Sequence, residues 1–400
     1  MFGSMKLVVA SLAVLFSLPS KAWLPGDVTP NVRRWVQNGK VRGVNLGSLF
    51  VVEPWLCGSE WSTMGCGGLE SEWDCVKKLG QDRADSAFQS HWARWITDKD
   101  FDEMKSYGLN AVRIPLGFWL DESLVRQGEY YPRGGEEHLL KVCEMASSRG
   151  FYIILDMHAA PGVQASSQSF AGHTTSDVQF FNDGNYQRGV DFLKYLTKLA
   201  HTRSEMRNVG MIGVVNEPAR GHDDLRSKFY PNAYNGIRQV ESGLKVKDKL
   251  HVQFMGSAWG AGNPKEFLPS GAESVAFEDH RYQKWDSSIA LTHEAFISDA
   301  CTSDRNPNNE TPMLVTEWAI SPPDSVENSD PAWRRDGGND DFYRKWFRAQ
   351  VTGYERTTAG WTYWNWKAEL GDWRWSYRDA VAAGIVPKDL SGVAGSGACS

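Results

Sequence analysis

The sequence predicts an α/β protein built as a single (β/α)8 barrel, the TIM-barrel fold. Short apolar segments alternate with segments of helical periodicity along most of the 400 residues, which is typical of parallel strands connected by helices. Residues 209–215 are all apolar or glycine, which suits a strand buried on both faces. The rival fold, an open doubly wound sheet, needs a glycine-rich phosphate loop after its first strand, and GVNLGS is not one.

The first two strands flank a long connection. Residues 40–46 (KVRGVNL) are expected to form strand 1, and residues 109–115 (LNAVRIP) strand 2. Residues 47–99 carry several cysteines and are too long for an ordinary strand-to-helix connection. We therefore predict a long cysteine-bearing loop after strand 1 that builds one wall of a site. Residues 98–107 begin with Asp98 and place apolar residues on one face, which predicts a helix.

The remaining elements repeat this alternation in order. Helical spacing predicts helices at residues 136–150, where a glycine ends the pattern, and at 190–202, 234–244, 292–300 and 339–353. Apolar segments predict the other strands at residues 151–158, 209–217, 251–256, 275–282, 313–318 and 360–366. With 41% hydrophobic residues, a chain of this length can fill the core of one such barrel.

The N-terminus has the pattern of a secretory signal peptide. Lys6 precedes an apolar segment at residues 7–18, and small residues stand at −3 and −1 of a cleavage site after Ala22. We expect residues 1–22 to be removed and residues 23–400 to form one catalytic barrel domain, secreted from the cell. The alternative is an uncleaved anchor, but the apolar segment is too short to span a bilayer.

Charge and composition limit the partners. The formal net charge of −6 disfavours nucleic acid and anionic membranes, and we expect a monomer. Eighteen tryptophans are many for this length; most would serve packing, but sugar rings also stack on indoles, so the excess favours a carbohydrate ligand. The single Asn-x-Ser/Thr sequence, at Asn309, lies in a polar segment where a glycan would fit.

The six cysteines suit an oxidising compartment. We expect one disulfide among Cys57, Cys66 and Cys75, and a second that joins Cys301 to Cys399. Cys143 lies in a segment of helical pattern, which predicts a free core thiol there. No pair has the C-x₂-C spacing with nearby histidines, so we expect no zinc, no other metal and no cofactor.

Polar and aromatic side chains gather where the predicted strands end, which packing alone would not require. They are Glu53 after strand 1, Arg113 in strand 2, His158 at the end of strand 3, Asn216 and Glu217 at strand 4, His280 and Tyr282 at strand 6, Glu317 at strand 7 and Trp364 at strand 8. Each alone has a structural explanation, since a strand-end histidine is more often hydrogen-bonded structure than a catalyst. Together they predict an active site, because the strands of a barrel end at one mouth.

Two strand-end glutamates indicate glycoside hydrolysis, which needs a carboxylic acid that protonates the leaving oxygen and a carboxylate that faces the anomeric carbon. We assign Glu217 as acid/base and Glu317 as nucleophile, the latter held ionised by hydrogen bonds from Arg113 and Tyr282. In a retaining enzyme the two carboxyl groups stand about 5–5.5 Å apart. Supporting roles are predicted for Asn216 on the sugar 2-hydroxyl, His280 on Glu217, Trp364 under the reacting sugar and His158 on a sugar hydroxyl.

These residues carry a resemblance to a known family. The segments VRGVNLGSLFVVEPW, GLNAVRIPLGFW, ILDMHAAPG, VVNEP, EDHRY, VTEW and GWTYWNWK, in this order between residues 41 and 375, resemble glycoside hydrolase family 5. The resemblance implies a retaining (β/α)8 hydrolase of β-linked glycans that needs no metal. It places the functional positions at Arg113, His158, Asn216, Glu217, His280, Tyr282, Glu317 and Trp364.

Within that family the chain is similar to two secreted fungal groups, the exo-β-1,3-glucanases and the endo-β-1,6-glucanases. The first segment and EWSTMGC at residues 60–66 resemble the second group more, and VQASSQSFAGH at residues 163–173 departs from the exo group. Glu53 matches a glycone-binding carboxylate of the exo group, but Trp55 replaces its tyrosine. The resemblance thus implies an endo-β-1,6-glucanase acting on fungal-type cell-wall β-glucan. The alternatives are an exo-β-1,3-glucosidase, a non-catalytic carbohydrate-binding relic and a metal-dependent hydrolase.

Overall fold

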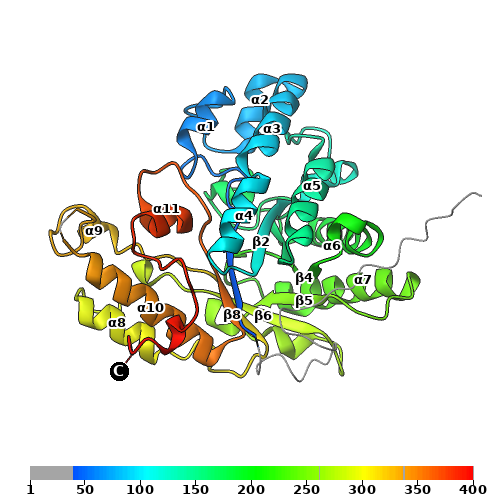
Figure 1. Cartoon of the computed structure of the whole chain (residues 1–400). Helices are drawn as coiled ribbons and strands as arrows, with labels where there is room; N and C mark the ends of the chain where they lie inside the picture. Colours follow the sequence, from blue (N-terminus) through cyan, green and yellow to red (C-terminus); the bar gives the residue numbers. More distant parts are fainter. Residues whose placement is uncertain (1–38, 261, 337, 400) are drawn as a thin grey trace, which may run out of the picture.

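Eight parallel strands close into a barrel in the computed structural model, which describes residues 39–260, 262–336 and 338–399 (Figure 1). Each strand pairs with the next along the chain, and the last pairs with the first, with Gly43 opposite Thr362. The predicted fold class is therefore confirmed. The predicted signal peptide lies outside the described residues. The strands are β1 Val41–Asn45, β2 Ala111–Gly117, β3 Tyr152–Ala159, β4 Val209–Gly213, β5 His251–Met255, β6 Val275–His280, β7 Met313–Glu317 and β8 Gly360–Tyr363.

Several strands end earlier than predicted. β4 was expected to continue to Glu217 but ends at Gly213, although Val214 and Asn216 still donate backbone hydrogen bonds to β5 and β3. Glu217 itself has a φ of +39°, a backbone conformation that residues other than glycine rarely adopt. This conformation turns the chain out of the sheet. The polar residues at the barrel mouth thus stand on the first turn beyond a strand as well as on its last residue.

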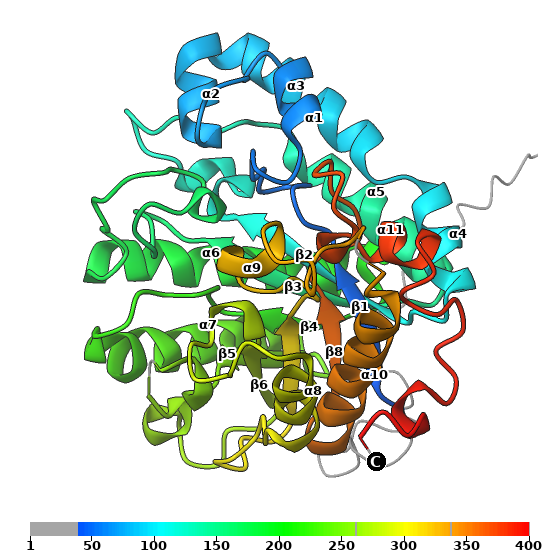
Figure 2. The same ribbon diagram turned by 90° about the vertical axis from the view of Figure 1, so that its left-hand side faces the viewer.

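Long helices surround the strands, as the view in Figure 2 shows. They are α4 Asp98–Ser106, α5 Gly135–Ser148, α6 Asp183–Thr202, α7 Tyr230–Gly243, α8 His293–Thr302 and α10 Asp340–Thr357. Each of the predicted helices is present. α4 begins at Asp98 as predicted, and Thr97 caps it: the Thr97 backbone N–H donates to the Asp100 carboxylate at 2.9 Å.

The long connection after β1 is partly helical. It contains α1 Gly58–Thr63, α2 Glu72–Leu79 and α3 Gln81–Trp95, which project from one side of the barrel (Figure 1). The sequence predicted only a loop here, although the buried residues of α3 recur at helical spacing: Ala84, Phe88, Trp92 and Trp95. Short helices also follow the last two strands, α9 Asp324–Glu327 and α11 Tyr377–Ala382.

Apolar side chains fill the barrel near the start of its strands. They form a separate inner cluster from successive strands: Val41, Ala111, Tyr152, Ile154, Met211, Ala276, Leu314 and Ala359. A larger apolar shell lies between the strands and the helices. The start of the barrel is therefore closed by packing, and polar chemistry is confined to the opposite mouth.

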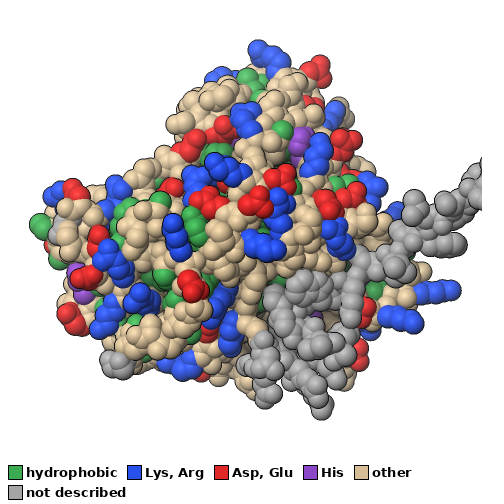
Figure 3. Space-filling model, viewed as in Figure 1, with side chains coloured by type: hydrophobic (Ala, Val, Ile, Leu, Met, Phe, Trp, Pro, Cys, Tyr) green, Lys and Arg blue, Asp and Glu red, His purple; other side chains and the backbone are tan. Residues whose placement is uncertain are grey.

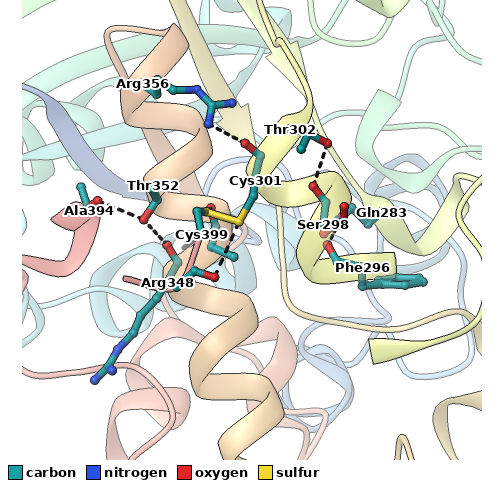
Figure 4. Close-up of a disulfide and its surroundings, with 12 residues drawn as sticks. Gln283, Phe296, Ser298, Cys301, Thr302, Arg348, Thr352, Arg356, Ala394 and Cys399 are labelled. Atoms are coloured by element: carbon teal, nitrogen blue, oxygen red, sulfur yellow. Dashed lines mark hydrogen bonds between the residues drawn. A yellow bond between two sulfur atoms is a disulfide. The ribbon is translucent and has the colours of Figure 1, made fainter. Parts of the chain in front are cut away.

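Both predicted disulfides are present. Cys66 is bonded to Cys75 within the long connection, and Cys301 on α8 is bonded to Cys399 in the C-terminal tail (Figure 4). The Thr352 side chain of α10 donates to the Ala394 backbone at 3.2 Å, so the tail is held across α10 as well. The remaining cysteines, Cys57 and Cys143, are free and buried, and Cys143 lies on α5 as expected.

The surface carries charges of both signs. Over the face that Figure 3 shows, lysine and arginine side chains are interspersed with aspartate and glutamate, in keeping with the small net charge. Asn309 is exposed between α8 and β7, so the predicted glycosylation site is accessible. Within the part of the chain that is described, no helix combines the length and apolar character needed to cross a membrane.

Candidate active site

A cleft of about 800 Å³ opens at the mouth of the barrel, and the predicted site residues converge on it. Most of them line it directly: Glu53, Trp55, His158, Asn216, Glu217, Tyr282, Glu317 and Trp364. The other two, Arg113 and His280, are buried and contact its carboxylates from inside the barrel. The structure therefore brings together every predicted position.

Glu217 and Glu317 face each other across this cleft. Three atoms lie within 4.8 Å of one another: a carboxylate oxygen of Glu217, a carboxylate oxygen of Glu317 and Nδ1 of His280. Glu217 follows β4 and Glu317 ends β7, strands that are not neighbours in the barrel, and the closed sheet brings the two residues to one mouth. The short separation agrees with the spacing of a retaining pair and leaves no room for a water molecule between sugar and nucleophile, as an inverting pair would require.

Glu317 is held from two sides. Arg113 donates to Oε1 at 2.7 Å, and the Tyr282 hydroxyl donates to Oε2 at 2.9 Å. Burial alone would lower the pKa of Arg113, but the carboxylates of Asp156, Glu278 and Glu317 outweigh burial and raise it, so the guanidinium stays charged. A fixed cation and a fixed hydroxyl thus stabilise Glu317 as a carboxylate.

Glu217 has a different partner. Nδ1 of His280 lies 2.7 Å from Oε1 of Glu217 and 3.5 Å from Oε2 of Glu317. Burial would lower the pKa of His280, but the surrounding carboxylates, Glu317 foremost, raise it to about 10. The ring is therefore an imidazolium that donates its Nδ1 proton to Glu217.

His158 and Trp364 form a stacked pair in the cleft. Their rings are parallel within 8° with centroids 5.5 Å apart, and Nδ1 of His158 lies 2.8 Å from the Asp156 carboxylate. Burial lowers the pKa of His158 to about 3, so the ring is neutral. A neutral ring that donates through Nδ1 keeps Nε2 as an acceptor for a ligand hydroxyl.

Glu53 and Trp55 come from the long connection after β1. The Trp55 indole N–H donates to Oε2 of Glu53 at 2.9 Å, whereas the buried Oε1 has no hydrogen-bond partner among the described residues. Burial, with smaller contributions from Glu317 and Glu217, raises the pKa of Glu53 to about 8. A third carboxyl group, mostly protonated at neutral pH, therefore lines the cleft and can both donate and accept hydrogen bonds there.

Sequence reasoning missed residues of two kinds. Buried supports are the first kind: Asn45 accepts from Arg113 at 3.0 Å, and Asp156 and Glu278 surround the same guanidinium. Their strand positions beside predicted site residues were the available signal. The second kind is the aromatic lining from loops, which no local pattern distinguishes from core residues: Phe170, Trp259, Trp285 and Trp375.

The group most suited to a metal, among described residues, is Glu217, His280 and Glu317. The ligand atom of His280 would be Nδ1, which already carries the proton shared with Glu217. An imidazolium has no lone pair to offer a metal, so the trio fits an ion pair better than a metal site.

A (β/α)8 barrel whose mouth holds two opposed carboxylates in an aromatic cleft has the architecture of a glycoside hydrolase. The family described as Cellulase (glycosyl hydrolase family 5) matches residues 77–370. The chain belongs to glycosyl hydrolase family 5, which confirms the resemblance seen in its motifs.

Several known proteins are similar to this chain over most of its length. "Probable glucan endo-1,6-beta-glucosidase B" of Neosartorya fischeri is 46% identical and covers 98% of this chain and 99% of its own. "Glucan endo-1,6-beta-glucosidase B" of Emericella nidulans is 45% identical over 96% and 98%. "Glucan 1,3-beta-glucosidase" of Blumeria graminis is 28% identical over 88% of both. The solved structure of rutinosidase from Aspergillus niger has the same fold, with a TM-score of 0.66 at 19% identity over 87% of this chain and 98% of that one.

Proposed function

We propose that this protein is a secreted, retaining endo-β-1,6-glucanase that acts on β-1,6-linked glucan of fungal-type cell walls. The short separation of the Glu217 and Glu317 carboxylates carries the chemical part of the proposal. The linkage and the endo mode rest on the relatives, since the glucan endo-1,6-beta-glucosidases are far more similar to this chain than the glucan 1,3-beta-glucosidase is.

The reaction proceeds by double displacement. Glu317 attacks the anomeric carbon and forms a glycosyl ester, while Glu217 gives its proton to the leaving oxygen. A water molecule then attacks the ester, Glu217 takes a proton from that water, and Glu317 leaves as a carboxylate. His280 donates to Oε1 of Glu217, so Oε2 is the oxygen that carries the proton to the substrate.

The neighbouring residues bind the sugar that reacts. The Asn216 side-chain oxygen accepts from Arg113 at 2.9 Å, which turns its amide N–H groups toward the cleft and the sugar 2-hydroxyl. Trp364 supplies an apolar floor, and His158 and Glu53 supply polar groups for other hydroxyls. Trp55 extends this surface outward, with 43% of its area exposed.

Release from the cell is part of the proposal. The leader at residues 1–22 supports it, and the two disulfides fit an oxidising compartment.

Two glucans test the linkage and the mode together. The mature protein is incubated with pustulan, a β-1,6-glucan, and with laminarin, a β-1,3-glucan, and the products are sized over time beside a Glu317→Gln control. Early oligosaccharides of several lengths from pustulan alone are the expected result. Glucose released first from laminarin would instead support the exo-β-1,3-glucosidase alternative, and no product from either would support the carbohydrate-binding relic.

A further inference from the structure

Arg220 and Trp259 form a cation–π pair at the edge of the cleft. The Arg220 guanidinium lies over the indole of Trp259, 5.1 Å from its centroid, and both residues line the cleft. Arg220 is exposed and has no hydrogen bond or ion pair with any of the residues that the structure describes. Its N–H groups are held in place by the ring and are free to bind a ligand.

The pair lies on the acid/base side. The Trp259 indole N–H donates to the Pro218 backbone oxygen at 3.2 Å, directly after Glu217, and its ring centroid is 5.9 Å from that of His280. Because the acid/base protonates the oxygen that leaves, the sugar attached to that oxygen must lie beside Glu217. The pair therefore borders the leaving part of the substrate.

The cleft continues beyond this pair. A second pocket of about 230 Å³ shares Ala219 with the main cleft and is bordered by Arg226, Gly260 and Gly262. The glycines of this edge approach both arginines closely: a Cβ at Gly260 would lie 3.2 Å from Nε of Arg220, and a Cβ at Gly262 would lie 2.5 Å from Cζ of Arg226. Both glycines also have positive φ angles, so the backbone makes room for the two guanidinium groups.

We propose that Arg220 and Trp259 are a leaving-group clamp that binds glucose units on the reducing-end side of the cleaved bond, with the pocket at Arg226 taking the next unit. The proposal rests on the proposed glucanase function and adds how an endo-acting enzyme engages the chain on that side. The ligand is a β-linked glucan, whose hydroxyls meet the N–H groups of Arg220 and whose C–H face meets the indole.

The test separates binding of the leaving group from catalysis. Arg220→Ala and Trp259→Ala are assayed on reducing-end-labelled gentio-oligosaccharides and on 4-nitrophenyl β-gentiobioside, whose leaving group contains no sugar. We expect kcat/KM on the oligosaccharides to fall about tenfold, as for loss of a hydrogen bond to a charged group, and the aryl glycoside to change less than about twofold. Cleavage should also move toward the labelled end, since fewer units would be held on that side.

Two further variants serve as controls. Arg348→Ala removes one exposed arginine from α10, outside the cleft, and should leave both activities unchanged. Trp259→Phe keeps an aromatic ring and should recover part of the oligosaccharide activity. Equal losses on both substrates, or no change on the oligosaccharides, would overturn the clamp. If the wild type cleaves β-1,3-linked oligosaccharides instead, the proposed linkage is wrong, and the same comparison is made on those.

Discussion

The two glutamates of the cleft lie in contrasting surroundings. The Glu317 side chain is 6% exposed and accepts hydrogen bonds from a fixed cation and a fixed hydroxyl, Arg113 and Tyr282. The Glu217 side chain is 19% exposed, lies on a backbone turn beyond β4 and, among the described residues, accepts a hydrogen bond from His280 only. Glu317 is thus fixed by donors on both of its oxygens, whereas Glu217 has a donor on one oxygen and is more exposed, in keeping with the different roles proposed for the two in double displacement.

Loss of Glu317, the proposed nucleophile, should have the largest effect. Glu317→Gln keeps the size of the side chain but cannot form the glycosyl ester, so turnover should vanish on every substrate. Circular dichroism and thermal melting should show a folded protein, which serves as the control. Turnover at the wild-type rate would remove Glu317 from the mechanism.

The effect of losing Glu217, the proposed acid/base, should depend on the leaving group. Glu217→Ala should slow hydrolysis of natural glucans by about 10²–10⁴-fold, whereas substrates with activated aryl leaving groups need no protonation and should lose much less in the first step. Rates on pustulan and on a dinitrophenyl glycoside provide the measurement. Losses of the same size on both would contradict the contrast between the two glutamates.

Loss of one hydrogen bond to the nucleophile should have a smaller effect. Tyr282→Phe removes only the hydroxyl that donates to Glu317, so kcat/KM should fall by about 10- to 100-fold, the value of a hydrogen bond to a charged group. Initial rates on an aryl glycoside measure it. An unchanged rate would mean that Arg113 alone fixes the nucleophile.

Glu53 is a third carboxyl group of the cleft, and its protonation state should affect the free energy of unfolding. Its folded-state pKa of about 8 lies above the ordinary value of 4.5, so the folded protein keeps a proton that the unfolded chain loses. The stability contributed by this group therefore falls by about 1.4 kcal/mol per pH unit between pH 4.5 and 8, then levels off. Glu53→Gln should lose this dependence.

Urea unfolding of both proteins from pH 4 to 9 measures the difference. The free energy of unfolding of Glu53→Gln, minus that of the wild type, should grow with pH across this window. A constant difference would show that Glu53 is ionised in the folded state.

Metal removal should have no effect. His280 and the two glutamates are close enough to hold an ion, but the imidazolium already pairs with Glu217, so EDTA should leave activity on pustulan unchanged. Inactivation that is reversed by added Zn²⁺ or Mn²⁺ would show that His280 binds a metal ion through Nδ1 in place of the proton.

The residues that converge on the cleft could be predicted from sequence because their signal is local. An apolar segment that leads into Glu217, or into Glu317, is visible in a few residues, and a closed parallel barrel brings such segment ends to one mouth. For the cysteines, the sequence predicted one disulfide among Cys57, Cys66 and Cys75 and the Cys301–Cys399 bond, but only the structure decided that Cys66 pairs with Cys75. Helix α3 was missed although its spacing was visible, because the whole connection was taken as loop.

The sequence by itself determined the barrel, its order of strands and the identity of the paired glutamates, since hydrophobic periodicity and strand ends are properties of short segments. Only the tertiary structure decided which residues border the cleft. Loops supply Arg220 over Trp259, the pocket next to them and the exposed face of Trp285, and the course of these loops depends on contacts far along the chain. A tryptophan in a loop has the same sequence pattern whether it lines a cleft or fills the core. Its role is therefore fixed by the segments that pack around it.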